Sequence, residues 1–273
     1  MAKVLTKQKK DKDCLEVLRQ LLHYDRTHKY RGRSKKPQCI LVGVDEVGRG
    51  CFAGPVVAAA VMLPEIDNRG EIAQALSELN DSKLLTAVQR ERLSLIIHEI
   101  AFCAIGQASP AEINEINILQ ASLLAMRRAL EKLTPAIGDE LPVLVLVDGN
   151  KAIRDIDHIQ TTVIQGDSTS ASIAAASVVA KVYRDALMTD LGQSFPEYSW
   201  HQNKGYGSRT HREALKKLGM TCHHRKLFCR KHISADGDNG DINDGADIIE
   251  GGDIEGGEFE DYMEDLLEAA PFN

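Results

Sequence analysis

Two adjacent acids, Asp45 and Glu46, follow directly after the apolar run "CILVGV" of residues 39–44, and the loop Gly48-Arg49-Gly50 comes next. An apolar run of this length, bounded by a glycine-containing turn, predicts a buried strand. Two carboxylates at the end of a buried strand repel each other unless something positive lies between them. The pattern therefore indicates a site that holds a cation or a proton.

A third acid has the same placement, because Asp148 ends the apolar run "PVLVLVD" of residues 142–148. If the two predicted strands lie side by side, their terminal acids can converge at one place. Converging carboxylates are held by protonating one of them or by binding divalent cations, and ligand sets made only of oxygen favour Mg²⁺ or Mn²⁺. A second interpretation stays open at this point, because an Asp after a strand is often a turn or helix-cap residue.

The elements that must position these acids predict an α/β fold, with a mixed sheet and helices packed on it. The strand at 39–46 and the run "GPVVAAAVML" at 54–63 are joined by a tight loop and predict an antiparallel pair. Helices are expected to begin at Thr86, as a capping box, and at Ser109, which precedes a proline. The other expected elements are strands within 99–108 and 161–164, a short helix near 13–24 and long helices over 116–133 and 170–191.

Several motifs, in this order along the chain, resemble those of bacterial ribonuclease HII. They are "GVDEVGRGCFAGPVVAAAV" from residue 43, "NDSK" at 80–83, "VDGN" at 147–150, "GDS" followed by "SIAAASVVAKVYRD" at 172–185, and "NKGYGSRTHREAL" at 203–215. "HHRKLF" at 223–228 is similar to the family's "HHRRSF" pattern, with Lys226 and Leu227 as departures. The resemblance runs from about residue 39 to 231 and implies a ribonuclease H-like mixed sheet flanked by helices, with a helical C-terminal extension.

The resemblance implies an endoribonuclease that hydrolyses the RNA strand of RNA/DNA hybrids and cuts 5′ of single ribonucleotides embedded in duplex DNA. It implies 3′-hydroxyl and 5′-phosphate ends, two Mg²⁺ or Mn²⁺ ions, and roles in ribonucleotide excision repair and DNA replication. The family's catalytic, metal-binding carboxylates map onto Asp45, Glu46, Asp148 and, from "YRD", Asp185. Taken without the resemblance, Asp185 is most simply the partner of Lys181 in a surface ion pair four residues apart.

Substrate-binding residues are implied in the same way. Recognition of one ribose in DNA requires reading a 2′-hydroxyl, and glycines at 48 and 50 let the backbone approach a sugar while Arg49 contacts a phosphate. Tyr206 matches a tyrosine that stacks on the sugar of the nucleotide after the ribonucleotide. The simpler alternatives are an ordinary glycine turn and a half-buried tyrosine. Candidate phosphate contacts, each of which could also be a solvated surface charge, are Lys181, Arg184, Lys204, Arg209 and Arg212.

Two rival functions remain. A ribonuclease HIII-like enzyme shares the fold but normally carries a larger N-terminal substrate-binding domain and lacks the "DEVGRG" pattern. A non-catalytic RNA/DNA hybrid-binding protein would bind the same substrates without cleaving them. Metal-dependent cleavage separates this second rival from the enzyme.

The charge of the chain is divided unevenly along its 273 residues. Residues 1–38 carry 12 Lys and Arg against 4 Asp and Glu, residues 39–233 carry 21 against 22, and residues 234–273 carry 14 acids and no Lys or Arg. We expect a basic N-terminal arm, a catalytic domain over 39–233 and an acidic, disordered tail. Either the tail is a solubilising extension, or a short amphipathic helix in it docks on this protein or on an unknown protein partner, through Phe259, Tyr262, Met263, Leu266 and Leu267.

The sequence also bears on the cellular compartment. Its six cysteines are scattered, which fits reduced thiols, and the spacing of Cys222 and Cys229 matches none of the usual zinc patterns. No apolar run approaches the roughly 20 residues of a membrane-spanning helix, and the lysine-rich N-terminus has no apolar signal region. We expect a cytoplasmic monomer.

Overall fold

A five-stranded mixed sheet forms the centre of the chain in a computed structural model, which describes residues 2–30, 36–138 and 140–233, with side chains from residue 14 onward. The strand order is β3-β2-β1-β4-β5. The antiparallel pairs are β1 with β2 and β2 with β3, and the parallel pairs are β1 with β4 and β4 with β5. The strands are β1 Ile40–Val47, β2 Val56–Met62, β3 Phe102–Ala108, β4 Val143–Asp148 and β5 Ile159–Val163. This sheet confirms the predicted fold class.

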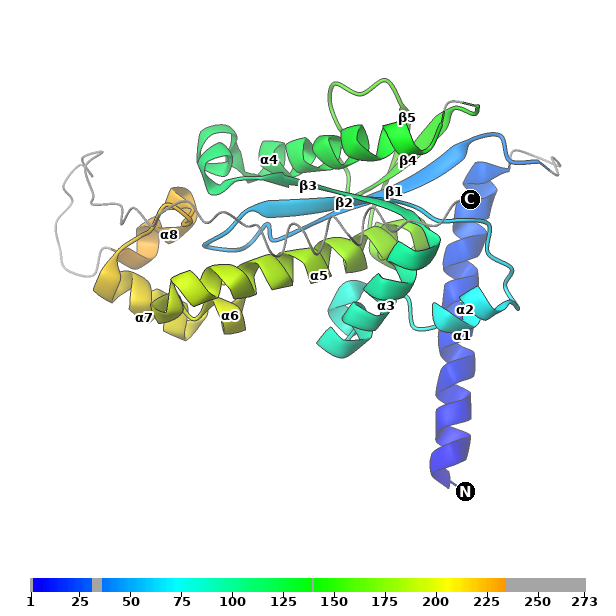
Figure 1. The fold of residues 1–273 in the computed structure, drawn as a ribbon, viewed down its shortest axis with the longest axis horizontal. Coiled ribbons are helices and arrows are strands. Elements are labelled where there is room, and N and C mark those ends of the chain that lie inside the picture. Colours follow the sequence, from blue (N-terminus) through cyan, green and yellow to red (C-terminus); the bar gives the residue numbers. More distant parts are fainter. Residues whose placement is uncertain (1, 31–35, 139, 234–273) are drawn as a thin grey trace.

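Helices cover both faces of the sheet (Figure 1). Helix α4 (Pro110–Leu133) lies on one face, and α3 (Ala87–Ile100) and α5 (Ala171–Ser194) lie on the other. Because side chains alternate along a strand, β2, which is buried except for Met62, supplies both cores. Its residues 57, 59 and 61 join the core beneath α5, whereas residues 56, 58 and 60 join the core beneath α4.

Helix α5 lies unusually close to β1, and this closeness depends on small residues. A Cβ added at Gly43 of β1 would lie 2.2 Å from the backbone carbon of Ser172 in α5. The alanines of α5 at positions 171, 174, 175, 176 and 180 are buried and keep the helix surface flat enough for this approach. A side chain at position 43 would push the helix away from the sheet.

The helix starts follow the predicted caps. Thr86 Oγ1 accepts a hydrogen bond from Gln89 N, Ser109 Oγ accepts one from Glu112 N, and both caps are complete capping boxes. Within α4 the backbone leaves the helical region at Asn117 (φ 68°, ψ 164°), and Asn117 Oδ1 accepts hydrogen bonds from the N–H groups of Leu119 and Gln120. Asn117 therefore caps the second stretch of this helix, a break that apolar periodicity alone does not indicate.

Short helices after α5 form the predicted C-terminal extension and gather at one end of that helix (Figure 1). They are α6 (Trp200–Asn203), α7 (Arg209–Leu218) and α8 (Lys226–Ile233). They enclose a separate buried cluster that includes Tyr198 and Trp200. The remaining short elements are α2 Glu71–Ala75, η1 Ser82–Leu84, η2 Thr134–Ala136, η3 Gly166–Ser168 and η4 Pro196–Tyr198.

The helix expected near 13–24 is present as α1 (Ala2–Lys29), and its C-terminal half belongs to the core. Leu18, Leu21 and Leu22 pack into the cluster beneath α5. The boundaries expected after residues 38 and 233 stay predictions. The acidic tail at 234–273 and the lysine side chains of the first 13 residues lie outside what the structure describes.

Hydrogen bonds to Asp25 connect α1 with the N-terminus of α5. Its carboxylate is 8% exposed and accepts hydrogen bonds from Ser170 Oγ (2.5 Å), Ser172 N (2.9 Å) and Ser172 Oγ (2.7 Å). Ser170 is the N-cap of α5, so the acid of one helix satisfies donors at the N-terminus of another, where negative charge is favourable.

We expect Asp25→Ala to destabilise the fold by about 2–4 kcal/mol, because three buried donors would lose their acceptor. Urea unfolding measures this change in the free energy of unfolding. Glu16→Ala is the matched control on the same helix. Glu16 has 61% of its side chain exposed and, among the residues the structure describes, forms an ion pair only with Arg19. Its effect should stay below about 0.5 kcal/mol. Equal effects of the two substitutions would contradict the capping role of Asp25.

None of the helices in the described ranges combines the length and apolar character needed to cross a membrane.

Candidate active site

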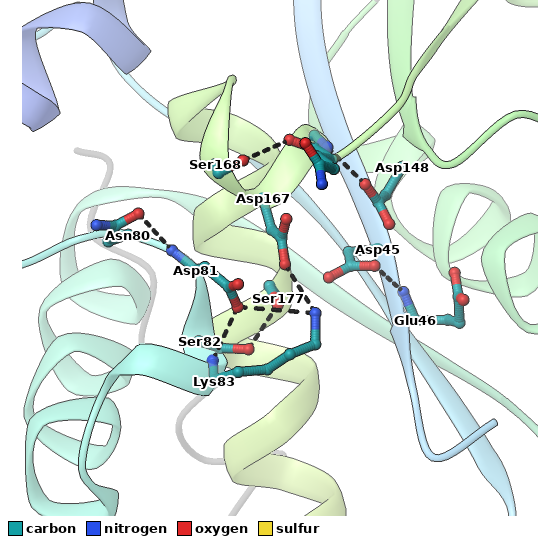
Figure 2. Close-up of polar contacts among 12 residues, drawn as sticks. Asp45, Glu46, Asn80, Asp81, Ser82, Lys83, Asp148, Asp167, Ser168 and Ser177 are labelled. Carbon is teal, nitrogen blue, oxygen red and sulfur yellow. Dashed lines mark hydrogen bonds and ion pairs between the residues drawn. The ribbon is translucent and has the colours of Figure 1, made fainter. Parts of the chain in front are cut away.

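The sheet brings the three predicted acids together. β1 and β4 run parallel with Val44 opposite Val147, so Asp45 and Asp148 follow on neighbouring strands at the same edge. One carboxylate oxygen from each of Asp45, Glu46 and Asp148 lies within 4.8 Å of the others. Figure 2 shows Asp45 close to Asp148 on the neighbouring strand, with Glu46 at the next position of β1. The convergence expected from strand ends is thus present.

Asp45 lies deepest in this group, with 5% of its surface exposed. Its Oδ1 accepts a hydrogen bond from Glu46 N at 2.7 Å, and its side chain also contacts Ser177 of α5. Burial is the largest influence that raises the pKa of Asp45 well above its usual value, followed by the charges of Glu46 and Asp148. The carboxylate therefore lies where its negative charge is unfavourable unless a cation is bound.

The other two acids are held by different partners. Burial raises the pKa of Glu46, and Arg49 Nη1, 3.0 Å from Glu46 Oε1, opposes that rise. Asp148 Oδ1 accepts a hydrogen bond from Gly166 N at 2.7 Å. Among the ion pairs of the described residues, none includes Asp45 or Asp148. Clustered carboxylate oxygens, two of them on acids outside these ion pairs, fit a hard divalent ion such as Mg²⁺ or Mn²⁺.

A fourth acid, Asp167, borders the group and was not among the predicted site residues. It lies in η3, shortly after β5, with 8% of its side chain exposed. Burial is the main cause that raises its pKa, and Asp148 is among the neighbouring charges that raise it further. Figure 2 shows Asp167 beside Asp45 and Asp148. The signal was available in the sequence, because Asp167 closely follows a predicted strand, as Asp148 ends one.

Lys83 is the second residue that the site prediction did not include. Its Nζ lies 3.0 Å from Asp167 Oδ2 and 3.7 Å from Asp81 Oδ1, and its side chain is 79% exposed. Asp81 caps η1 by accepting a hydrogen bond from Lys83 N at 2.9 Å. These contacts hold an exposed cation at the rim of the acidic group (Figure 2).

Asp185, predicted as the fourth metal ligand, is not among the acids that the described structure groups with Asp45. Ser177, which contacts Asp45, and Asp185 are eight residues apart on α5, which corresponds to about 12 Å along a helix. Asp185 Oδ1 instead accepts a hydrogen bond from Lys181 Nζ at 2.5 Å. This is the ion pair that the spacing of the two residues indicates without the resemblance.

Arg184 also differs from its prediction as a phosphate contact, because its side chain is fully buried. Its Nε, Nη1 and Nη2 donate hydrogen bonds to the carbonyl oxygens of Pro55 (3.0 Å), Lys204 (2.9 Å) and Ala53 (3.1 Å). Gly48 packs directly on this guanidinium: φ is +92°, and an added Cβ would lie 2.2 Å from Arg184 Nε. Arg184 therefore supports the loop from inside.

A second buried arginine supports the same loop. Arg225 donates from Nη1 to the carbonyl oxygens of Gly48 (2.7 Å) and Arg49 (3.0 Å), and from Nε to that of Gly54 (2.9 Å). In the described part of the chain, no hydrogen bond runs from the backbone N–H groups of residues 48–50. The carbonyl oxygens of Gly48 and Arg49 are thus held by a buried arginine, and the backbone N–H groups of residues 48–50 are available to a substrate. The Arg49 side chain is 53% exposed.

Tyr206 lies beside this loop and is 43% exposed. Lys181 Nζ is 5.8 Å from the centre of its ring, so Tyr206 and the Lys181–Asp185 ion pair are neighbours. The preceding Gly205 carbonyl accepts hydrogen bonds from Phe52 N (2.8 Å) and Ala53 N (3.2 Å). The tyrosine and the glycine loop are therefore connected through their backbones.

Comparisons with known proteins bear on the family of this chain. A family model described as "Ribonuclease HII" matches residues 42–232. A curated ribonuclease HII of Ruegeria pomeroyi is 50% identical over 192 residues, which cover 70% of this chain and 77% of that protein. A ribonuclease HII of Fusobacterium nucleatum is 47% identical over 197 residues, covering 72% of this chain and 88% of that protein.

Solved structures show the same fold at low sequence identity. The structure of the PCNA:RNase HII complex from Archaeoglobus fulgidus matches with a TM-score of 0.57 at 22% identity, covering 72% of this chain and 98% of that one. Bst-RNase HIII in complex with Mn²⁺ matches with a TM-score of 0.54 at 23% identity, covering 70% of this chain and 65% of that one. These likenesses bear on the fold alone.

Proposed function

This chain belongs to the ribonuclease HII family, endonucleolytic hydrolases that act on RNA/DNA hybrids, and on that premise we propose that it also cuts 5′ of single ribonucleotides embedded in duplex DNA. The products would carry 3′-hydroxyl and 5′-phosphate ends. The observation that carries this proposal is the acidic group formed by the buried Asp45 and the partly buried Glu46 and Asp148. It supplies the oxygen ligands that metal-dependent phosphodiester hydrolysis requires.

We propose that Asp45, Glu46, Asp148 and Asp167 together hold two divalent ions, Mg²⁺ or Mn²⁺, with Asp167 in the role that the family resemblance assigns to Asp185. When bound, the ions supply the positive charge that activates a water molecule and stabilises the leaving oxygen of the cleaved phosphodiester. The choice of metal is supported by the oxygen-only donor set and by the Mn²⁺ complex of a protein with the same fold.

The chain's own cations and backbone donors orient the nucleic acid in this proposal. Arg49 and Lys83 are exposed at the rim of the acidic group and can contact phosphates on either side of it. The backbone N–H groups of residues 48–50 donate to the ribose 2′-hydroxyl or to a phosphate. The Tyr206 ring packs on the sugar of the next nucleotide, where a 2′-hydroxyl would be sensed sterically, and Lys181 supports that ring or an adjacent phosphate.

Other partners of the chain are also proposals. The RNase HII of Archaeoglobus fulgidus was solved in a complex with PCNA. That complex is a property of the archaeal protein and is not assigned to this chain. A monomeric state and a protein partner for the acidic tail at 234–273 stay predictions for this chain.

The proposed activity is tested on three 5′-labelled duplexes: DNA with one ribonucleotide, a uniform RNA/DNA hybrid, and all-DNA. With Mg²⁺ or Mn²⁺ we expect cleavage of the first two duplexes only. In the first duplex the cut should fall at the phosphodiester bond immediately 5′ of the ribonucleotide. No cleavage should occur when EDTA removes the metal. Ligation of the products after separation checks the 3′-hydroxyl and 5′-phosphate ends. Binding of both RNA-containing duplexes without cleavage in either metal would support the non-catalytic alternative.

A further inference from the structure

A chain of buried side chains beneath Tyr206 has no part in the proposed hydrolysis. Trp200, His211 and His224 are 0%, 0% and 2% exposed. Trp200 Nε1 lies 3.1 Å from His211 Nε2, and His224 Nε2 lies 3.1 Å from the same atom. The other nitrogen of His211, Nδ1, lies 2.9 Å from the carbonyl oxygen of Tyr206.

The partners determine which nitrogen of each imidazole carries the proton. The indole N–H of Trp200 can only donate, so His211 Nε2 is an acceptor and its proton is on Nδ1. The backbone N–H of Thr221 donates to His224 Nδ1 at 2.9 Å, so the proton of His224 is on Nε2, where it faces His211 Nε2. The two donors, Trp200 Nε1 and His224 Nε2, then share the single lone pair of His211 Nε2.

The result is one directional set of hydrogen bonds that ends on the Tyr206 backbone, with His211 Nδ1 as its last donor. Burial lowers the pKa of both imidazoles, and that of His224 to about 3. Both rings therefore remain neutral at physiological pH, and His211 stays a fixed donor.

Several contacts hold the Tyr206 backbone, and the position of that backbone sets the position of the Tyr206 ring. The same oxygen also accepts a hydrogen bond from Ser208 N at 2.7 Å, and Tyr206 N donates to Asn203 O at 2.9 Å. On the following Gly207, an added Cβ would lie 2.4 Å from the Phe52 ring, so the segment is packed against the loop that carries Gly48–Gly50. A shift of the Tyr206 carbonyl would move the ring relative to that loop.

We propose that His211 is a positioning residue for substrate selection. Its hydrogen bond to the Tyr206 carbonyl holds the tyrosine ring where the ring can distinguish a deoxyribose from a ribose. This inference rests on the proposed role of Tyr206. His211 touches neither substrate nor reacting atoms in this scheme.

The test compares His211→Gln and His211→Asn in the full chain. Asn keeps a donor near the Nδ1 position and loses the Nε2 acceptor, whereas Gln reaches the Nε2 position and loses the Nδ1 donor. The measured quantity is kcat/KM for a duplex with one ribonucleotide divided by kcat/KM for a uniform hybrid. Tyr206→Ala and the double variant His211→Gln with Tyr206→Ala are measured beside them, and melting temperatures show whether each variant is folded.

We expect His211→Gln to lower this ratio about three- to tenfold, the effect of losing one hydrogen bond, and His211→Asn to leave the ratio near that of the unchanged protein. The double variant should match the ratio of Tyr206→Ala alone, because both changes act through the same ring. If His211→Gln does not fold, Trp200→Phe takes its place, since it removes a donor that orients His211; its ratio should fall by a smaller factor.

An unchanged ratio in folded His211→Gln, or in Trp200→Phe where that variant takes its place, while Tyr206→Ala lowers it, would overturn the inference and leave the proposed function intact. Equal losses on both substrates would also overturn it, since they indicate a purely structural role. An unchanged ratio in Tyr206→Ala itself would instead overturn the role of Tyr206 in the proposed function, and the inference with it.

Discussion

Replacing Asp45 with Asn is expected to reduce cleavage of both RNA-containing duplexes by more than about 100-fold, because loss of a direct ligand should exceed the cost of losing an outer hydrogen-bond partner. The substitution keeps the shape of the side chain and removes one charge from a group of three acids, of which Asp45 is the buried one. The melting temperature in metal-free buffer should not fall, since less negative charge is confined there. Initial rates in Mg²⁺ and Mn²⁺, with thermal melts in EDTA, measure both expectations.

Asp155→Asn is the matched control for this experiment. Asp155 has 80% of its side chain exposed and pairs with Arg127, and asparagine tolerates its positive φ of 58°. Its rate should stay within about twofold of the unchanged protein. Turnover by Asp45→Asn at the control's rate would exclude Asp45 as a metal ligand.

Asp167→Asn should likewise lower cleavage by more than about 100-fold, whereas Asp185→Asn should cost about tenfold or less. The difference follows from position. Asp167 lies beside Asp45 and Asp148 (Figure 2), whereas Asp185 pairs with Lys181 on α5. Raising the Mn²⁺ concentration should partly restore Asp167→Asn if its defect is weaker metal binding, and should leave Asp185→Asn unaffected.

The reverse ranking, with Asp185 the more damaging site, would restore the assignment made from the sequence and refute the one made from the geometry. Comparable losses at both positions would require that α5 move toward the acidic group when substrate binds.

The convergence of Asp45 and Asp148 could be predicted because it depends only on strand order and direction. Both acids end apolar runs, and the β1–β4 pair is parallel, so the two ends meet at one edge. The helix caps at Thr86 and Ser109 could also be predicted, since a capping box is a local sequence pattern.

Other features depend on contacts that no local pattern contains. A charged residue in a helix pattern is usually exposed, so the burial of Arg184 follows only from the carbonyl groups that the loop 53–55 and Lys204 bring to it. Likewise, the choice between Asp167 and Asp185 depends on how far along α5 the acidic group lies. Sequence order placed both acids near recognisable motifs but did not give that distance.

The hydrogen bond between Asp25 and Ser170 joins residues 145 positions apart, which has a consequence for how the chain is made on the ribosome. At about 5–20 residues per second, synthesis of the intervening segment takes roughly 7 to 30 s. During that time α1 has left the ribosome, but the serines that will receive Asp25 do not yet exist. The loop at Glu65 and Ile66, which contacts Lys29 and Arg26, is synthesised about 100 residues sooner and can hold the helix provisionally. Helix α1 therefore reaches its final hydrogen bonds only after a much later part of the chain has been made.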